Sequence, residues 1–423
     1  MPVRRFDSKA WKESPQWRRQ LDMSHFAKER AVVAEICARV AAEGDAALRE
    51  LSSKFDGWAP GPDESFEVPR SELAEAAESL PSADRAALEF AAQRIRNFHT
   101  RQLPVAPNGP ENLRLITRPV NRVGVYAPGG RAAYPSTVLM TVIPARVANV
   151  PEVVLATPPG RDGKVARAIL AAAHIAGVNA VYRVGGAQAI AALAYGTESI
   201  PRVDVVAGPG NIYVTLAKKE VFGSVGVDGI AGPTEVLVIA DANARPDFVA
   251  ADLAAQLEHD PLASAVLITD SSQLAGRVEE ELESLVRGLD RAEIIRQASC
   301  SLVVVDDLDE AIELANDFAP EHLLIVADDA EKLAARIESA GAVFVGPYAT
   351  VPLGDYTAGP NHTLPTSGAA RFSSPLGVHT FLKRSSLLSL DRSDLEMLRD
   401  ASVRLAEMEG LGAHAHAIEV RLE

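Results

Sequence analysis

The chain has few aromatic residues and no long apolar run. Phe, Trp and Tyr make up 5% of its 423 residues, while hydrophobic residues as a whole reach 47%. A core built mainly from Ala, Val and Leu is typical of α/β layers, whose buried parallel strands are short apolar segments. No stretch of about 18 uninterrupted apolar residues occurs, so the sequence predicts no membrane-spanning helix and no membrane partner. A chain of this length suggests two or three domains.

Cysteine is also scarce. The chain has two, Cys37 and Cys300, and neither belongs to a metal-binding or redox motif. We expect both to be packed in a core, Cys37 within a helix and Cys300 just before a strand. A secreted protein held together by disulfides is excluded, and a reducing cytoplasm fits the composition. The basic residues 1–19 contain no apolar segment and therefore do not form a signal peptide.

Basic side chains are outnumbered by acidic ones. The 42 Lys and Arg residues stand against 57 Asp and Glu residues, which gives a formal net charge of -15. Such a surface repels phosphate backbones and argues against nucleic acid as a partner. Small neutral or basic substrates suit this charge better.

The first quarter of the chain predicts helices but carries no recognisable chemistry. Residues 1–24 form a polar arm in which Trp11 and Trp17 are the large apolar anchors, suited to docking on another subunit or domain. Alanine-rich amphipathic patterns over 24–54 and 71–102 predict helices.

From Asn121 onward, short apolar strands alternate with helices. The expected strands cover 122–126, 153–156, 180–184 and 203–207 in a first set, and 235–241, 265–269, 302–305, 323–326 and 343–345 in a second set. Repeated strand–helix units predict parallel sheets covered on both faces by helices. Beyond Val378 we expect a basic strand-like stretch and a helix over 393–408.

Glycine-rich loops follow three of the strands in the first set. They are APGG at 127–130, GGAQ at 185–188 and GPGN at 208–211. None is a GxGxxG motif, but each allows backbone amides to approach a phosphate. Any one of these loops alone is best interpreted as a tight turn. Three of them at the carboxyl ends of strands favour a nucleotide cleft.

A carboxylate and an imidazole stand side by side at Glu321 and His322, in the sequence NDFAPEHLL. The stiff Ala319–Pro320 step precedes them, and an apolar run that predicts a buried strand follows. Adjacent residues of a strand point to opposite faces, so both can serve one site only where the chain turns at a strand end. The pair offers two proton-transfer groups of different basicity. Taken alone, a capping Glu and a surface His are the simpler interpretation.

Other metal-binding and acid–base side chains are scattered. Gln256 and His259 are three residues apart, so on a helix they share a face. Asp355 and His362 lie in GDYTAGPNHTLPTSG, a segment that we expect to be a loop because it is rich in Gly and Pro.

The C-terminal tail adds Glu409 and His414, which flank an expected turn at Gly410. An amide oxygen, a carboxylate and two imidazoles would suit a divalent ion such as Zn²⁺. Most histidines are not ligands, however, and we interpret the remaining ones as structural: His25, His99, His174, His379 and His416.

Eight sequence blocks, in order along nearly the whole chain, resemble the histidinol dehydrogenase family. The blocks are VYAPGGRAAYPSTVLM, GGAQAIAALAYGTE, AGPGNIYV, GIAGPTEVLVIAD, AQLEHDP, FAPEHL, GDYTAGPNHTLPT and EGLGAHAHA. No single block is specific, whereas the ordered set is. The resemblance implies an NAD-dependent oxidation of L-histidinol to L-histidine through L-histidinaldehyde, in two steps at one site, as the last steps of histidine biosynthesis.

The resemblance also implies roles for individual residues. One zinc ion per subunit would be held by Gln256, His259, Asp355 and His414, the last from the partner of a homodimer. The catalytic pair would be Glu321 and His322. NAD contacts would fall on Tyr126, Gln188 and Asn211. Substrate contacts would fall on Thr234, Gln256, His259, His322, Asp355, His362, Glu409 and His414. Some family members carry Ser in place of Thr234, and because the hydroxyl is kept we expect the same role.

The fold that the resemblance implies is α/β. It consists of two similar three-layer α/β/α domains of the aldehyde-dehydrogenase-like, incomplete Rossmann type, with short exchanged terminal segments. The expected domains are an N-terminal arm at 1–24, a discontinuous first domain at 25–120 plus 236–377 with the metal and catalytic residues, an inserted domain at 121–235 with the NAD-binding loops, and a C-terminal segment at 378–423 that contributes to the partner's site.

The reaction explains why these residue types are needed. The imidazole of His322 suits removal of the hydroxyl proton, and Glu321 suits activation of the water that the aldehyde must take up. Zinc would orient the substrate through its imidazole and amine nitrogens. Neither cysteine lies in any of the eight blocks, which argues against a thiohemiacetal route.

Two alternatives stay open. One is a related zinc- and NAD-dependent dehydrogenase of another polar alcohol, such as a sulfonated diol, although His362 and Glu409 favour histidinol. The other is a zinc hydrolase, because Glu, His and a metal also activate water. The three glycine loops argue against the hydrolase.

Overall fold

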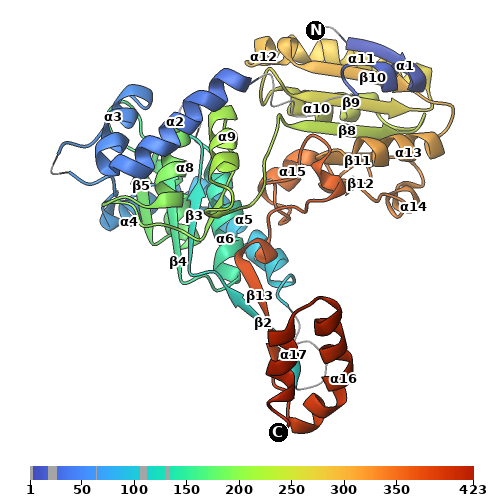
Figure 1. The fold of residues 1–423 in the computed structure, drawn as a ribbon. Helices are drawn as coiled ribbons and strands as arrows, with labels where there is room; N and C mark the ends of the chain where they lie inside the picture. Colours follow the sequence, from blue (N-terminus) through green and yellow to red (C-terminus); the bar gives the residue numbers. More distant parts are fainter. Residues whose placement is uncertain (1–2, 18–25, 63, 105–111, 130–132) are drawn as a thin grey trace. The chain divides into compact units, whose positions relative to one another are not determined.

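The computed structural model describes residues 3–17, 26–62, 64–104, 112–129 and 133–423. The expectations for His25 and Gly130 therefore fall outside the described residues. The chain divides into two compact units (Figure 1), each taken by itself below. Unit 1 comprises Met1–Leu103 and Val120–Phe381, and unit 2 comprises Pro104–Pro119 and Leu382–Glu423.

Unit 1 contains a five-stranded sheet in the order β5-β4-β3-β6-β7, and every neighbouring pair is parallel. Its strands are β3 (Arg122–Tyr126), β4 (Glu152–Thr157), β5 (Ala180–Arg183), β6 (Val205–Ala207) and β7 (Gly226–Val227). The helices that follow the first four strands are α6 (Pro135–Val147), α7 (Arg167–Ala176), α8 (Gly186–Tyr195) and α9 (Ile212–Val221). The strand–helix alternation of the sequence is confirmed here.

Helices from the first hundred residues cover this five-stranded layer. They are α2 (Ala27–Glu43), α3 (Asp45–Phe55), α4 (Arg70–Glu78) and α5 (Ser82–Thr100). α2 packs on α8 and α9, α4 on α7, and α5 on α6 (Figure 1). Val33 and Leu48 share one apolar core with Leu193 of α8. We expected 25–120 and 236–377 to form one discontinuous domain. Both layers belong to unit 1, so the domain boundaries themselves remain a prediction.

Unit 1 also contains a six-stranded, wholly parallel sheet in the order β1-β10-β9-β8-β11-β12. Its strands are β1 (Val3–Asp7), β8 (Glu235–Ala240), β9 (Ser264–Thr269), β10 (Ser299–Val304), β11 (His322–Val326) and β12 (Ala342–Val345). The helices are α10 (Pro246–Leu257), α11 (Ser272–Val286), α12 (Ala292–Gln297), α13 (Leu308–Phe318), α14 (Ala330–Ala334) and α15 (Val351–Tyr356). Separate apolar clusters lie on its two faces, as expected for three layers.

The N-terminal arm docks on this six-stranded sheet of its own chain. β1 is the edge strand beside β10, and α1 (Ser8–Glu13) follows it. Trp11 is fully buried, and its ring lies 4.8 Å from that of Trp17 and 5.2 Å from that of Phe318, between centroids. The two tryptophans are therefore anchors, and their docking site is a domain within the same chain.

Unit 2 consists of a two-stranded ribbon and two helices. β2 (Leu113–Pro119) pairs antiparallel with β13 (Leu382–Leu388), and α16 (Arg392–Met408) and α17 (Gly412–Glu419) follow. The expected turn at Gly410 is confirmed by its left-handed φ of 73°. Helix α17 was not predicted, because the alternating Ala and His residues at 413–417 show no apolar helical face.

Two local expectations in unit 1 were wrong. Asp355 lies in the short helix α15 and not in a loop, because Pro352 occupies its first turn, where the missing N–H has no cost. His259 lies just beyond the last residue of α10, so it does not share a helical face with Gln256. Among the described residues, no helix is both long and apolar enough to cross a membrane.

Candidate functional site

The predicted catalytic pair lies at the amino end of β11. Helix α13 ends at Phe318, Ala319 takes a left-handed φ of 50°, and Pro320 turns the chain into the strand. Glu321 precedes β11, and His322 is its first residue. Gly341 permits the close approach of the next strand, since a Cβ there would lie 2.5 Å from the Glu321 carbonyl oxygen. The expected turn at a strand end is thus present, at the amino end.

Glu321 is a buried carboxylate fixed by two donors on one oxygen. Its Oε2 accepts a hydrogen bond of 2.6 Å from the Thr234 hydroxyl and one of 2.8 Å from the Glu235 backbone N–H. Thr234 immediately precedes β8, the parallel neighbour of β11. Burial raises the pKa of Glu321, and nearby His322 partly opposes this effect. The carboxylate is therefore held in place and made more basic than an exposed one.

His322 is held by a hydrogen bond at one ring nitrogen. Its Nδ1 lies 3.0 Å from the backbone oxygen of Glu235, and because a carbonyl only accepts, Nδ1 must donate. The other ring nitrogen, Nε2, lies 3.9 Å from Asp355 Oδ1. This nitrogen is buried and has no hydrogen-bond partner among the described residues. The Glu235 carbonyl thus orients the His322 ring and leaves Nε2 without a hydrogen-bond partner near Asp355.

Three of the predicted metal ligands belong to unit 1. Gln256 Nε2 donates to the Thr234 hydroxyl over 2.6 Å, which leaves the amide oxygen on the opposite side of the group. His259 and Asp355 are close enough to act electrostatically on the pKa of both Glu321 and His362. Within the described ranges, no group of three or more His, Cys, Asp or Glu has the geometry of a metal site. The three donors suit Zn²⁺ chemically, with one of them being an amide oxygen.

His362 also lies at this site and is fixed at both ring nitrogens. Nδ1 donates to the Asp355 backbone oxygen over 2.9 Å, and the Thr137 hydroxyl lies 3.4 Å from Nε2. Burial lowers the pKa of His362, so the neutral ring is favoured. The neighbouring Asn361 anchors the segment by donating to the Met140 carbonyl over 2.6 Å.

The three predicted NAD contacts line one cavity of about 440 Å³ at the carboxyl ends of the five-stranded sheet. Tyr126 ends β3, and its hydroxyl accepts the Gly186 N–H over 3.1 Å. Burial raises the pKa of Tyr126 to about 12, so this phenol stays neutral. Gln188 lies in α8, and Asn211 caps the N-terminus of α9. Tyr126, Gln188 and Asn211 are therefore brought together as expected, and their role stays a prediction.

Sequence reasoning missed the charged residue of this cavity, Asp56. It follows α3, and its Oδ2 accepts hydrogen bonds of 3.1 Å from Gly185 N–H and 3.2 Å from Gln188 Nε2. Burial raises its pKa, whereas these donors oppose that effect. No signal in the sequence marked Asp56, because its partners lie about 130 residues further along the chain.

Comparison with known proteins decides the family. A sequence profile of histidinol dehydrogenase matches residues 18–422. The chain belongs to the histidinol dehydrogenase family. It is 52% identical over 394 residues to the histidinol dehydrogenase of Parasynechococcus marenigrum, covering 92% of this chain and 90% of that one. With the enzyme of Aquifex aeolicus it shares 51% identity, covering 92% and 91%. The crystal structure of histidinol dehydrogenase from Elizabethkingia anophelis matches with a TM-score of 0.91 at 34% identity, covering 99% and 98%.

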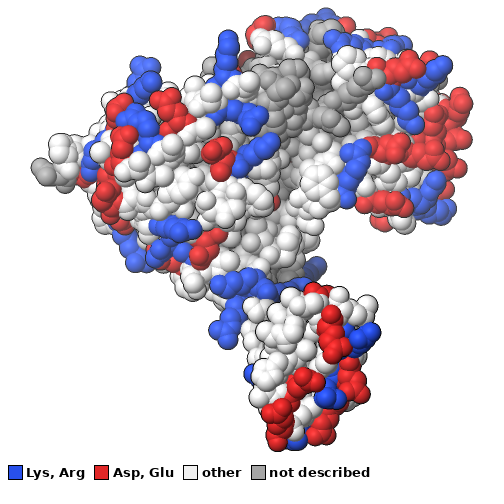
Figure 2. Space-filling model, in the orientation of Figure 1, with Lys and Arg blue, Asp and Glu red and all other residues white. Residues whose placement is uncertain are grey.

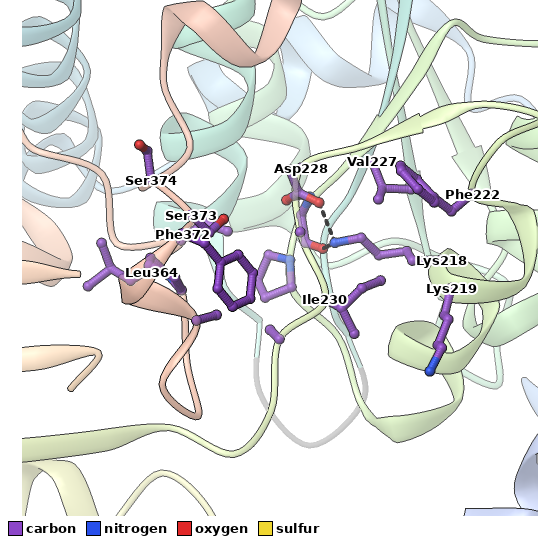
Figure 3. Close-up of a pocket in the computed structure, with 17 residues that line it drawn as sticks. Lys218, Lys219, Phe222, Val227, Asp228, Ile230, Leu364, Phe372, Ser373 and Ser374 are labelled. Carbon is purple, nitrogen blue, oxygen red and sulfur yellow. Dashed lines mark hydrogen bonds and ion pairs between the residues drawn. The ribbon is translucent and has the colours of Figure 1, made fainter. Parts of the chain in front are cut away.

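A further cavity of about 570 Å³ in this histidinol dehydrogenase family member lies beside the GPGN loop (Figure 3). A buried ion pair between Lys218 and Asp228 forms part of its wall. Lys218 Nζ donates to the Gly208 carbonyl over 3.1 Å, and Asp228 accepts the Gly208 N–H over 2.8 Å. Gly208 has a φ of 117°, and a Cβ there would lie 2.1 Å from the Tyr126 carbonyl oxygen. The ion pair thus holds the glycine loop against the end of β3.

The two remaining predicted site residues belong to unit 2. Glu409 is the C-cap of α16, and His414 lies in the first turn of α17. Both side chains are exposed within the single chain. Their expected contribution to the metal and substrate of a partner stays a prediction in this histidinol dehydrogenase family member.

Proposed function

We propose that this protein oxidises L-histidinol to L-histidine through L-histidinaldehyde, with one zinc ion per subunit and two molecules of NAD per turnover. The observation that carries the proposal is the pair of buried bases at the start of β11. His322 Nε2 has no hydrogen-bond partner among the described residues, and the Glu321 carboxylate is held by Thr234 and Glu235. Family membership, with a relative at 52% identity, supplies the substrate.

His322 would act in the first oxidation. Its Nε2 would take the proton of the substrate hydroxyl. A hydride would leave the carbon that bears this hydroxyl and pass to the nicotinamide. The Nδ1–H bond to the Glu235 carbonyl keeps the ring oriented and stabilises the imidazolium that forms. The products of this step are the aldehyde, NADH and a protonated His322.

Glu321 would act in the second oxidation. The aldehyde must first become a hydrate, and Glu321 would take a proton from the water as its oxygen bonds to the carbonyl carbon. The hydrate anion would then lose the hydride of that carbon to a second NAD and become the acid. Because Oε2 is engaged by Thr234 and Glu235, Oε1 is the oxygen left to accept that proton. The raised pKa of Glu321 makes it a stronger base than an ordinary carboxylate.

Gln256, His259 and Asp355, with His414 of the partner subunit, would hold the zinc ion. When bound, it would orient the substrate through the imidazole and amine nitrogens of the substrate. Thr234 links this group to the base, since its hydroxyl accepts from Gln256 and donates to Glu321. The orientation of the amide oxygen and that of the carboxylate are therefore set by one side chain.

The cavity lined by Tyr126, Gln188, Asn211 and Asp56 would hold the dinucleotide. The N-termini of α8 and α9 line this cavity, and the positive ends of their helix dipoles suit a pyrophosphate. Lys218 and Asp228 keep the GPGN loop in place beside it.

A homodimer with exchanged terminal segments would complete each site. Large apolar side chains are exposed on the helices of unit 2 and at the ends of α17: Met397, Leu398, Leu405, Met408, Leu411 and Val420. Figure 2 shows uncharged surface between the acidic and basic groups of unit 2. The buried residues of α16 and α17 are Ala406 and Ala415, so these helices bury little apolar surface within their own chain. A second copy that covers the apolar side chains would also order His414 for a metal.

The decisive experiment incubates the purified protein with NAD and a panel of alcohols and follows NADH at 340 nm. L-Histidinol should give close to two NADH per molecule consumed, with L-histidine as the product. NADH formation from a sulfonated diol alone would assign the related dehydrogenase activity. Hydrolysis of esters or amides without NADH formation would assign a hydrolase.

A further inference from the structure

We infer that Glu235 is a positioning residue for the catalytic base Glu321, acting through its side-chain carboxylate. The inference rests on the proposed function of Glu321. Glu235 begins β8, and its side chain is buried, with 3% of the residue exposed. Burying a carboxylate costs free energy unless hydrogen-bond donors surround it, so the donors that contact Glu235 indicate what its side chain does.

The main chain of Glu235 touches both catalytic side chains. Its N–H donates to Glu321 Oε2, and its carbonyl accepts from His322 Nδ1. These two bonds belong to the backbone and would persist with any side chain at position 235. They tie the amino end of β8 to the pair that begins β11.

The side chain of Glu235 makes a different pair of contacts. Oε1 accepts the Glu321 backbone N–H over 3.2 Å and the Ser367 backbone N–H over 3.1 Å. Ser367 has a left-handed φ of 54°, an unfavourable conformation for a residue other than Gly. One carboxylate oxygen therefore fixes the backbone that carries the base and a strained turn five residues after His362.

These contacts predict a selective defect. Loss of the Glu235 carboxylate frees the Glu321 backbone, whereas His322 keeps its bond to the carbonyl at 235. The step that needs Glu321, oxidation of the aldehyde, should therefore suffer more than the step that needs His322. A residue with a merely structural role would lower both steps together.

The test compares Glu235→Gln and Glu235→Met with Leu237→Ala in the holoenzyme. Leu237 is a fully buried residue of the same strand, and Leu→Ala controls for general loss of stability. Glu235→Gln keeps an oxygen that accepts both N–H groups, and it should retain both half-reactions. Glu235→Met should lower kcat for L-histidinaldehyde about 100-fold, the effect of displacing a reacting group by about 1 Å, and should lower alcohol oxidation much less. Should Glu235→Met fail to fold, Glu235→Asp replaces it, because a carboxylate one methylene shorter cannot reach both donors.

Hydrogen exchange gives a readout that is independent of activity. Peptides that contain Glu321 and Ser367 should exchange faster in Glu235→Met than in wild type, and at wild-type rates in Glu235→Gln. An equal fall of both half-reactions in Glu235→Met, matching Leu237→Ala, or unchanged exchange at Glu321, would overturn the inference. So would a Glu235→Gln protein that is folded but inactive. Failure of the wild type to oxidise L-histidinol would instead overturn the proposed function. The hydrogen-exchange rates would still show whether Glu235 holds the Glu321 backbone in place.

Discussion

The sharpest consequence of the site concerns Glu321→Gln, which should separate the two oxidations. The substitution preserves shape, and the amide oxygen can still accept from Thr234 and from the Glu235 N–H. It removes the proton acceptor for the attacking water, an effect on the order of 10²–10⁴-fold for a general base. Aldehyde oxidation should fall by that amount, while alcohol oxidation, which uses His322, should remain largely intact.

The assay measures NADH formation separately from L-histidinol and from L-histidinaldehyde, under single-turnover conditions. With L-histidinol, the variant should release close to one NADH per site in the fast phase, where the wild type gives two. In the wild type, the aldehyde step should gain rate as the pH rises through the raised pKa of Glu321, because only the carboxylate accepts a proton. A variant that oxidises both substrates equally well would refute the assignment of Glu321 as the base.

Stability provides the control for this variant. Burial raises the pKa of Glu321 above its ordinary value of 4.5, so the folded state disfavours the carboxylate relative to the unfolded chain. The resulting loss of folding free energy is absent below pH 4.5 and fully present once the pH exceeds the pKa of Glu321 in the folded protein. Glu321→Gln removes it and should unfold at the same or a higher temperature than the wild type at pH 8. The comparison requires chelated protein, since a bound cation would favour the carboxylate.

Four further outcomes are expected. Exhaustive chelation should abolish NADH formation and added zinc should restore it, whereas full activity in verified metal-free protein would exclude an essential metal. Thr234→Val should slow aldehyde oxidation by raising its activation free energy by about 1–3 kcal/mol, because the Gln256 amide and the Glu321 carboxylate each lose a hydrogen bond, and Thr234→Ser should be near wild type; equal rates in both would exclude the hydroxyl link. The double variant Cys37→Ala/Cys300→Ala should keep both half-reactions within a few-fold, because both thiols are buried and burial raises the pKa of each to about 12; selective loss of the aldehyde step would restore a thiol mechanism. Mixing inactive His259→Ala with inactive His414→Ala subunits should recover activity in up to about half of the heterodimer's sites, and no recovery after verified subunit exchange would mean that each chain builds its own site.

Much of the secondary structure follows from the sequence alone. The parallel strands appear as short apolar runs of Val, Ile, Leu and Ala, and their spacing from amphipathic helices predicts both α/β layers. Strand β3 has the bounds that the sequence predicted, Arg122–Tyr126. These features are local, because burial on both faces of a sheet demands apolar side chains wherever the strand lies.

The elements that the sequence did not reveal depend on contacts between distant segments. β1 is a polar edge strand that forms through backbone pairing with β10. The side chains of β1 show no strand pattern. Asp355 was expected in a loop, since glycines and prolines obscured the short helix that Pro352 starts.

The sequence likewise indicated part of the candidate site, and the tertiary structure decided the rest. The sequence drew attention to Glu321 and His322 as a pair and, through the ordered blocks, to the other predicted residues. Only parallel pairing of β8 with β11 places Thr234 and Glu235, 87 and 86 residues earlier in the chain, in contact with Glu321. Sequence periodicity indicates which face of a strand is buried, but it contains no information about which strand lies beside it. The partners of a buried carboxylate were therefore decided by the tertiary structure alone.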